Sequence, residues 1–300
     1  MLALSAGALC DAVEAVTGIT TAAHGLKFVN DGYAKFLEGL DPRDNERHIW
    51  SFLQPLATLA LAYQTTGTAT GVYSAATEIT TVTATAATFQ PTNIGDSMVV
   101  ADTGTLTIAD YTSATVVTVS GSHAFTGKAI TIPHGGLYDL PSDFGGMIDR
   151  PYYAYSTTAT RCELHESSAE QLLRMYENDT PVATAYYWAA VPAAFVAATG
   201  QRWQMMFYPR FDEARFTRYR YLVIPAALTD SSSVYTLGGA VHCYTIKTLA
   251  LSEYELSTGQ PGIYTADAKT HMITSIDHDR KMTETVGAVS IGHGGPEPMG

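Results

Sequence analysis

Two histidines lie close enough to carboxylates to suggest a metal site. His271 and His278 are seven residues apart in one predicted helix, so they share a face two turns apart. Their acidic neighbours are Asp267, Asp277 and Asp279. Zinc sites on a helix favour a spacing of four residues, and no cysteine completes this set. We therefore interpret the cluster as a solvated, mixed-charge part of a helix and predict no metal.

His165 is a second candidate for chemistry, because it lies between Glu163 and Glu166. A polar run of this kind is more typical of a helix start than of an acid–base pair. The chain also lacks a Gly-x-Ser-x-Gly elbow, a phosphate-binding loop and a dinucleotide fingerprint. We predict no catalytic residue, no cofactor and no enzyme. A hydrolase with two carboxylates facing each other in a cleft is the alternative in the enzyme class.

The densest basic group of the chain is interleaved with acidic residues. Its members are Arg210, Asp212, Glu213, Arg215, Arg218 and Arg220. A strip that binds phosphates would not carry carboxylates between its arginines, whereas complementary charges suit a contact between subunits. We therefore predict that these six residues form an inter-subunit interface.

These charges belong to the most strongly patterned stretch of the chain, Gly200 to Pro225. Large apolar residues alternate with polar ones before a charged turn at 209–213, and the alternation resumes after it. A period of two with many aromatic residues indicates half-buried strands. The stretch predicts a β-hairpin at the centre of an antiparallel core.

Helical periodicity marks both ends of the chain and one short middle segment. The predicted helices cover residues 1–17, 23–40, 167–178, 237–256 and 264–282, the third capped by Ser167 or Ser168. Gly32 lies inside the second helix, where it costs about 1 kcal/mol relative to alanine. We expect that it allows another helix to pack closely.

Residues 64–133 differ from the sequence on either side. Thr, Ala, Val and Ser dominate, and short β-like runs alternate with turn signals. This spacing predicts a small β-sandwich or barrel. A disordered, threonine-rich linker is the alternative, and the recurring Val, Ile and Phe residues argue against it.

Together these patterns predict an α+β chain. Its N- and C-terminal helices would form a bundle around a central antiparallel β core with an inserted small all-β module. The expected parts are residues 1–62 (N-terminal helices and first core strand), 63–135 (β insertion), 136–236 (β core), 237–284 (C-terminal helices) and 285–300 (a flexible tail).

Composition limits the possible partners. Only 15% of the 300 residues are charged and the net charge is −12, against about 25% charged residues in typical soluble domains. Such a chain is unsuited to tight nucleic-acid binding.

Cys10, Cys162 and Cys243 match no zinc or redox spacing, so we expect mostly buried thiols outside any disulfide. The apolar N-terminus precedes the first lysine, Lys27, and no run is long enough for a membrane span, so we predict a soluble protein made in the cytoplasm.

Scattered segments resemble the head-to-tail adaptor (neck, or head-completion) proteins of tailed bacteriophages. They are Val29–Tyr33, Phe36-Leu37, Asp41–Arg43, Trp50–Leu53, Leu56–Leu59, Asp139–Gly146, Gly200–Trp203, Tyr208-Pro209, Tyr219–Tyr221 and Leu237–Gly239. Their order follows a helix–β–helix layout, and the resemblance skips residues 64–133, which compact adaptors lack.

The resemblance implies a structural virion protein without catalytic residues. It would be made in the host cytoplasm and form a dodecameric ring between the portal and the tail, stopper or tail-terminator proteins. DNA would pass through the lumen without specific binding, and no membrane would be involved. The C-terminal segment would clamp the portal, through Val286, Ile291, Pro296, Pro298 and Met299. The alternative is a receptor- or carbohydrate-binding virion protein that uses the 64–135 module.

Overall fold

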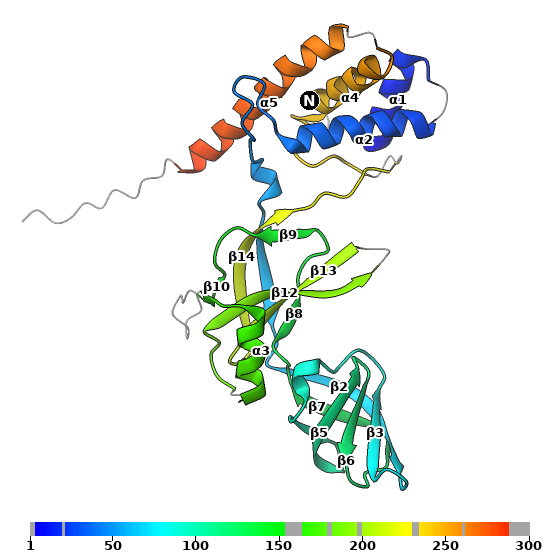
Figure 1. Cartoon of the computed structure of the whole chain (residues 1–300), viewed down its shortest axis with the longest axis vertical. Coiled ribbons are helices and arrows are strands. Elements are labelled where there is room, and N and C mark those ends of the chain that lie inside the picture. Colours follow the sequence, from blue (N-terminus) through cyan, green and yellow to red (C-terminus); the bar gives the residue numbers. More distant parts are fainter. Residues whose placement is uncertain are drawn as a thin grey trace, which may run out of the picture. The chain divides into compact units, whose positions relative to one another are not determined.

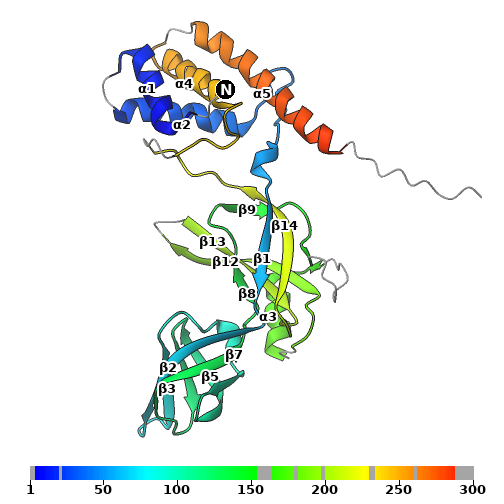
Figure 2. The same cartoon turned by 180° about the vertical axis from the view of Figure 1, so that it is seen from behind.

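The computed structural model describes residues 4–19, 22–153, 164–178, 182–196, 200–229, 234–259 and 262–287. The chain divides into two compact units (Figures 1 and 2). The helical unit comprises Met1–Pro55 and Val223–Gly300, and the β unit comprises Leu56–Leu222. The fold is mixed α+β, as predicted, and the terminal helices pack on one another. Among the described helices, none is both long and apolar enough to cross a membrane.

Four α-helices make the helical unit. They are α1 (Ala6–Thr17), α2 (Ala22–Glu38), α4 (Cys243–Ser257) and α5 (Ile263–Gly287), with a short 3-10 turn, η1 (Ser51–Leu53). α4 packs against α1, α2 and α5. Ser5 caps α1, and Gly18 ends it in the left-handed conformation that a helix terminus favours. All four predicted terminal helices are present, but α4 begins at Cys243 rather than Leu237. Gly238 and Gly239 have φ values of 86° and 72° and form a turn before it.

Gly32 marks the tightest approach in this unit. A Cβ atom built on Gly32 would lie 2.4 Å from the backbone nitrogen of Ala250 and 2.7 Å from its Cα, both in α4. Backbone atoms in a helix cannot move aside as a flexible side chain can. The expected role of Gly32 in close helix packing is therefore confirmed.

An aromatic cluster fills the space beside the start of α4. Trp50 donates from Nε1 to the carbonyl oxygen of Phe36 at 2.8 Å. His242 lies with its ring 5.3 Å from the rings of Phe36 and Trp50 and 5.7 Å from Phe52, measured between centroids. Its Nδ1 atom is buried and has no hydrogen-bond partner among the described residues. Burial lowers the pKa of His242 to about 4, with help from His278 and His48 and against the opposing charge of Asp279.

Two buried carboxylates fasten α5 to the segment after α2. Asp279 accepts hydrogen bonds from the backbone nitrogen of Ser51 at 3.0 Å and from its hydroxyl at 2.5 Å, and lies 2.8 Å from Nε2 of His48. Asp41, which is fully buried, pairs with Arg43 at 2.8 Å and with Arg280 at 3.3 Å. The hydrogen bonds from Arg43 lower the pKa of Asp41 to about 2. Both acids therefore stay ionised, and α5 is held by charge as well as by apolar contact.

Two four-stranded sheets lie in the β unit. The first contains β1 (Leu56–Leu61), β14 (Arg215–Val223) and β10 (Tyr152–Tyr153) in that order, and β9 (Phe144–Met147) also pairs with β14. The second has the order β11 (His165–Glu166), β12 (Tyr187–Val196), β13 (Gly200–Tyr208) and β8 (Leu137–Asp139). The helix α3 (Ala169–Asn178) packs on β12 and β13, and the Ser168 hydroxyl caps it, as predicted.

The prediction of a hairpin at Gly200–Pro225 is wrong, although both of its strands exist. β13 pairs with β12 and β8, whereas β14 pairs with β1, β9 and β10, so the two strands belong to different sheets. A hairpin turn needs solvated residues, but Arg210 and Phe211 in the connection are each 1% exposed. Their burial directs the chain from one sheet to the other.

Residues 64–133 form a closed six-stranded barrel. Its strands follow the order β2 (Gln64–Ser74), β3 (Ile79–Ala84), β6 (Val116–Ser120), β5 (Gly104–Ser113), β4 (Ser97–Val100) and β7 (Phe125–Pro133). Inward-facing residues such as Val82, Ile108 and Val117 are buried, while threonines alternate with them outside. The disordered-linker alternative is therefore wrong. The expected burial of the cysteines is confirmed for Cys10 and Cys243, and Cys162 lies outside the described residues.

Replacing Gly32 with alanine should destabilise the helical unit. Alanine would gain about 1 kcal/mol of helix propensity, but its Cβ would force α2 and α4 apart, and we expect a net loss of about 1–3 kcal/mol. Urea unfolding of the full chain, monitored by far-UV circular dichroism, measures this loss in the free energy of unfolding. Gly25→Ala in the same helix is the matched control, because its Cβ would meet only the Glu14 side chain. Equal stability of the two variants would contradict the close-packing role.

His242 should make the helical unit sensitive to acid. The unfolded chain binds a proton at His242 below its ordinary pKa of 6.5, while the folded chain does so only near pH 4. Stability should therefore fall, on the order of 1–3 kcal/mol, as the pH drops through this window. His242→Phe should reduce this fall in urea unfolding at several pH values, and His165→Phe, at an exposed position in β11, should not. A fall of the same size in His242→Phe would show that other groups cause it.

Candidate subunit interface

The first sheet presents one face to solvent. Strand register places Leu56 opposite Arg220, Thr58 opposite Arg218, and Ala60 opposite Phe216. Directly opposed residues of paired strands point to the same side. We call these six residues, on β1 and β14, the outer face.

The outer face is apolar and basic at once. Phe216 and Leu56 are 58% and 57% exposed. Arg220 lies 3.5 Å from Asp149, and Arg218 is exposed, with no ion pair among the described residues. The residues of β14 that alternate with the outer face, including Tyr219 and Tyr221, are buried. Burial raises the pKa of both tyrosines to about 12. The predicted interface residues Arg218 and Arg220 thus lie together on a surface.

Three other predicted interface residues pair inside the chain. Arg215 binds Glu213 at 2.7 Å, lies 3.7 Å from Asp212, and donates to the Thr184 hydroxyl at 3.1 Å. Its side chain is 15% exposed, while those of Asp212 and Glu213 are 48% and 59% exposed. This intramolecular pairing leaves the two carboxylates at the surface and mostly removes the arginine from it.

Arg210 is not at the surface, contrary to the prediction. Its guanidinium pairs with the buried carboxylate of Asp96 and donates to the backbone oxygen of Thr92. It also lies over the ring of Tyr176, 5.3 Å from the centroid. Burial excludes Arg210 from contact with another subunit and makes it a link between the second sheet and the barrel.

The segment before β4 completes this link, through the short turn η2 (Pro91–Asn93). Gln90 donates to the carbonyl oxygen of Leu137 at 2.6 Å and accepts from its nitrogen at 3.2 Å. Thr92 donates to Gly135 at 2.6 Å, and Asn93 donates to Asp96 at 2.9 Å. Amide and hydroxyl groups from one barrel loop therefore bind the backbone that leads from the barrel into β8.

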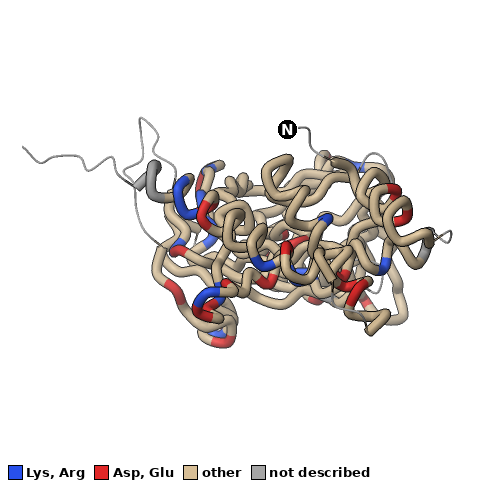
Figure 3. Tube along the Cα trace, turned by 90° about the horizontal axis from the view of Figure 1, so that it is seen from above, with Lys and Arg blue, Asp and Glu red and all other residues tan. Residues whose placement is uncertain are grey.

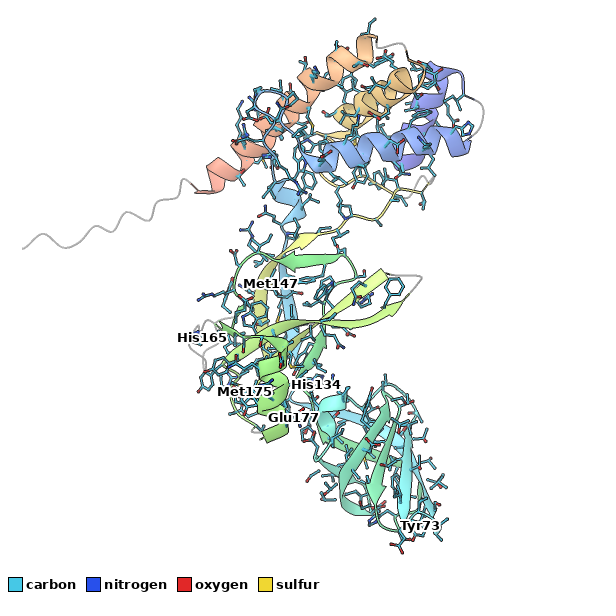
Figure 4. All side chains as sticks on the ribbon, viewed as in Figure 1. Tyr73, His134, Met147, His165, Met175 and Glu177 are labelled. Atoms are coloured by element: carbon cyan, nitrogen blue, oxygen red, sulfur yellow. The ribbon has the colours of Figure 1, made fainter. Side chains whose placement is uncertain are left out.

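His134 lies where the chain leaves the barrel (Figure 4). Its ring stacks on Tyr138 with centroids 4.2 Å apart, and its Nδ1 accepts from the nitrogen of Gly136 at 3.2 Å. Burial, and then the charge of Arg210, lower the pKa of His134 to about 4. The ring is therefore neutral at pH 7, and its Nδ1 serves as a hydrogen-bond acceptor.

A cleft of about 700 Å³ opens between the barrel and the arm formed by β12 and β13. Its polar lining includes Gln90, His134, Asp139, Arg202 and Gln204. Gln204 donates to Asp139 at 2.9 Å, so the one carboxylate in the lining already has a partner. The pair of facing carboxylates that a hydrolase would need is not present in this lining.

The residues considered for chemistry are dispersed. The ring of His271 packs against Tyr244, while that of His278 lies 6.0 Å from His242. His165 and Glu166 form the exposed strand β11, and Glu163 lies outside the described residues. In the described part of the chain, no three His, Cys, Asp or Glu side chains are placed to hold a metal ion. Acidic and basic residues are interspersed along the trace (Figure 3).

The structure describes none of the side chains predicted to contact the portal. Val286 belongs to the last turn of α5, but its side chain is not described. Ile291, Pro296, Pro298 and Met299 lie outside the described residues.

Sequence reasoning missed the buried polar links of Asp41, Asp96 and Asp279. One signal was available for Arg210, which follows Tyr208-Pro209 and precedes Phe211, so its neighbours in sequence are apolar. Its partner Asp96 is 114 residues away, and no local pattern joins the two.

The Arg210–Asp96 pair should behave as a coupled unit. Arg210→Met leaves the Asp96 carboxylate buried without its partner and should lower the free energy of unfolding by about 3–5 kcal/mol. Arg210→Met with Asp96→Leu should cost less than the sum of the single changes, in urea unfolding of the full chain. Arg218→Met, on the outer face, is the matched control and should change the free energy of unfolding by less than about 0.5 kcal/mol. Strict additivity would contradict the coupling.

No protein-family model matches the chain, and a search of the curated proteins finds none that is similar to it.

Proposed function

We propose that the chain is a structural virion protein that forms a head-to-tail adaptor ring between a portal and a tail. The observation that carries this proposal is the outer face, where two large apolar side chains and two arginines share one exposed sheet surface. Apolar residues with arginine are typical of the centre of protein–protein interfaces. A protein that works alone would gain nothing from this exposure.

Charge supports the same assembly. The outer face is basic, while the chain as a whole carries a net charge of −12 and exposes Asp212 and Glu213 elsewhere. A basic face on one copy can meet an acidic region on the next, which sets the register of a head-to-tail contact. Excess acidic residues around a lumen would repel the DNA backbone, so DNA slides through without binding.

The C-terminal segment is the proposed portal contact. It follows α5 and contains Ile291, Pro296, Pro298 and Met299, which can bury apolar surface against a partner. The proposed partners are thus further copies in a dodecameric ring, the portal, and the tail or stopper proteins.

A carbohydrate-binding function has less support. Sugar sites use exposed aromatic rings, but the large exposed apolar side chains of the barrel are Val72, Ile79, Ile94 and Val99, all of them aliphatic. Tyr73 and Tyr111 are partly buried. The barrel therefore offers no fully exposed aromatic face for stacking on a sugar.

The native mass of the purified chain, alone and with its candidate portal, tests the proposal. We expect rings in mass photometry and negative-stain images, at least when the portal is present. Arg218→Glu combined with Arg220→Glu should reduce ring formation at least about tenfold, whereas Arg174→Glu, at a site 72% exposed on α3, should not. A chain that ends at Gly287 should lose portal binding.

A wild-type chain that stays monomeric with and without the portal would overturn the adaptor function. A trimer that does not bind the portal would instead favour the receptor-binding alternative. Circular dichroism of each variant confirms that the fold is retained.

A further inference from the structure

β1 has an open edge. It pairs with β14 along all six of its residues, and no described residue pairs with its other side. Its sequence, Leu-Ala-Thr-Leu-Ala-Leu, contains no charge and no proline, and its register with β14 has no bulge. Natural proteins protect edge strands with charged residues, prolines or bulges, because an unprotected edge pairs with other chains. The absence of protection marks β1 as a strand that is covered in the assembled protein.

The edge lies beside the exposed apolar part of the outer face. Leu56 belongs to β1 itself, and Phe216 lies opposite Ala60 on the neighbouring strand. A partner at this edge could therefore pair with the backbone and cover both side chains. It would need an extended, uncharged segment with an apolar side chain near its end.

The chain itself carries such a segment. The strand β11 pairs with β12 only up to Trp188, and β8 pairs with β13 only from Gln204 onward. The remaining parts of β12 and β13 pair only with each other and form a two-stranded arm that projects from the rest of the β unit (Figures 1 and 2). The β12 strand of this arm has no charged residue, and no described strand pairs with its outer edge beyond Trp188. Pro192 lies on this edge, where sheets accept proline. The register with β13 shifts between Pro192 and Phe195, so regular backbone pairing along this edge is limited to Ala189–Val191 and Phe195 can contribute only its side chain. Phe195, near the tip, is 69% exposed, more than any other aromatic residue described.

We propose that, in the ring, the arm of one copy lies along the open edge of β1 in the next, with Phe195 packed against Leu56. This inference deepens the proposed adaptor function and rests on it. Donor and acceptor are different surfaces, so the contact is heterologous, and repeated heterologous contacts close into a ring when their rotation allows it. Phe195 would be the buried anchor, and Arg218 and Arg220 would border it.

Two single variants separate the donor from the acceptor. Phe195→Asp damages the arm and leaves β1 intact, while Leu56→Asp damages β1 and leaves the arm intact. Both positions are more than half exposed, so each variant should fold as the wild type does, which circular dichroism checks. Each should weaken self-association by about 30-fold or more, in the condition in which the wild type forms rings. Val72→Asp, at an exposed aliphatic site on the barrel, should assemble normally.

Mixing the two variants gives the deciding measurement. The intact arm of the Leu56→Asp chain should bind the intact edge of the Phe195→Asp chain, so mass photometry should show heterodimers and no rings. Rings that form normally from either variant, or a mixture without heterodimers, would overturn the arm–edge contact while leaving the adaptor function standing. Wild-type chains that never form rings, with or without the portal, would overturn the adaptor function and this contact with it.

Discussion

The β unit depends on one buried ion pair. Arg210 lies in the connection between two sheets, Asp96 lies in the barrel, and each is almost fully removed from water. Such a pair contributes little net stability compared with apolar residues, but its geometry admits few alternatives, because either charge alone would be costly to bury. With Gln90, Thr92 and Asn93 it specifies which barrel loop meets which sheet. Directional polar contacts of this kind specify an arrangement that apolar burial alone would leave open.

The helical unit uses the same strategy with different residues. Asp41 and Asp279 are buried carboxylates that gather Arg43, Arg280, Ser51 and His48 around α5. These links join segments more than two hundred residues apart, while Gly32 brings α2 against α4. His242 is an exception, because its ring is buried among aromatic residues and its Nδ1 has no hydrogen-bond partner among the described residues. An unsatisfied polar atom at such a location lowers stability.

Local patterns were sufficient to predict most elements but not how they pair. Helical periodicity located the five α-helices found in the described residues, and the alternation in Arg215–Val223 identified a strand. The same alternation could not show that β13 and β14 enter different sheets, since pairing depends on residues elsewhere in the chain. Of the predicted interface residues, Arg218 and Arg220 lie on a surface, whereas Arg210 is buried. A run of arginines carries no information about which one finds a distant carboxylate. The open edge of β1 was also invisible, because it is a property of the whole sheet.

The division of the chain has a consequence for its synthesis. The helical unit is discontinuous, since Met1–Pro55 and Val223–Gly300 are separated by the whole β unit. A ribosome that adds about 5–20 residues per second needs on the order of ten to forty seconds to pass from α2 to α4. During this interval α1 and α2 can pack on each other but lack their contacts with α4, while the β unit is already being completed. These two helices are thus made long before the helix that completes their packing.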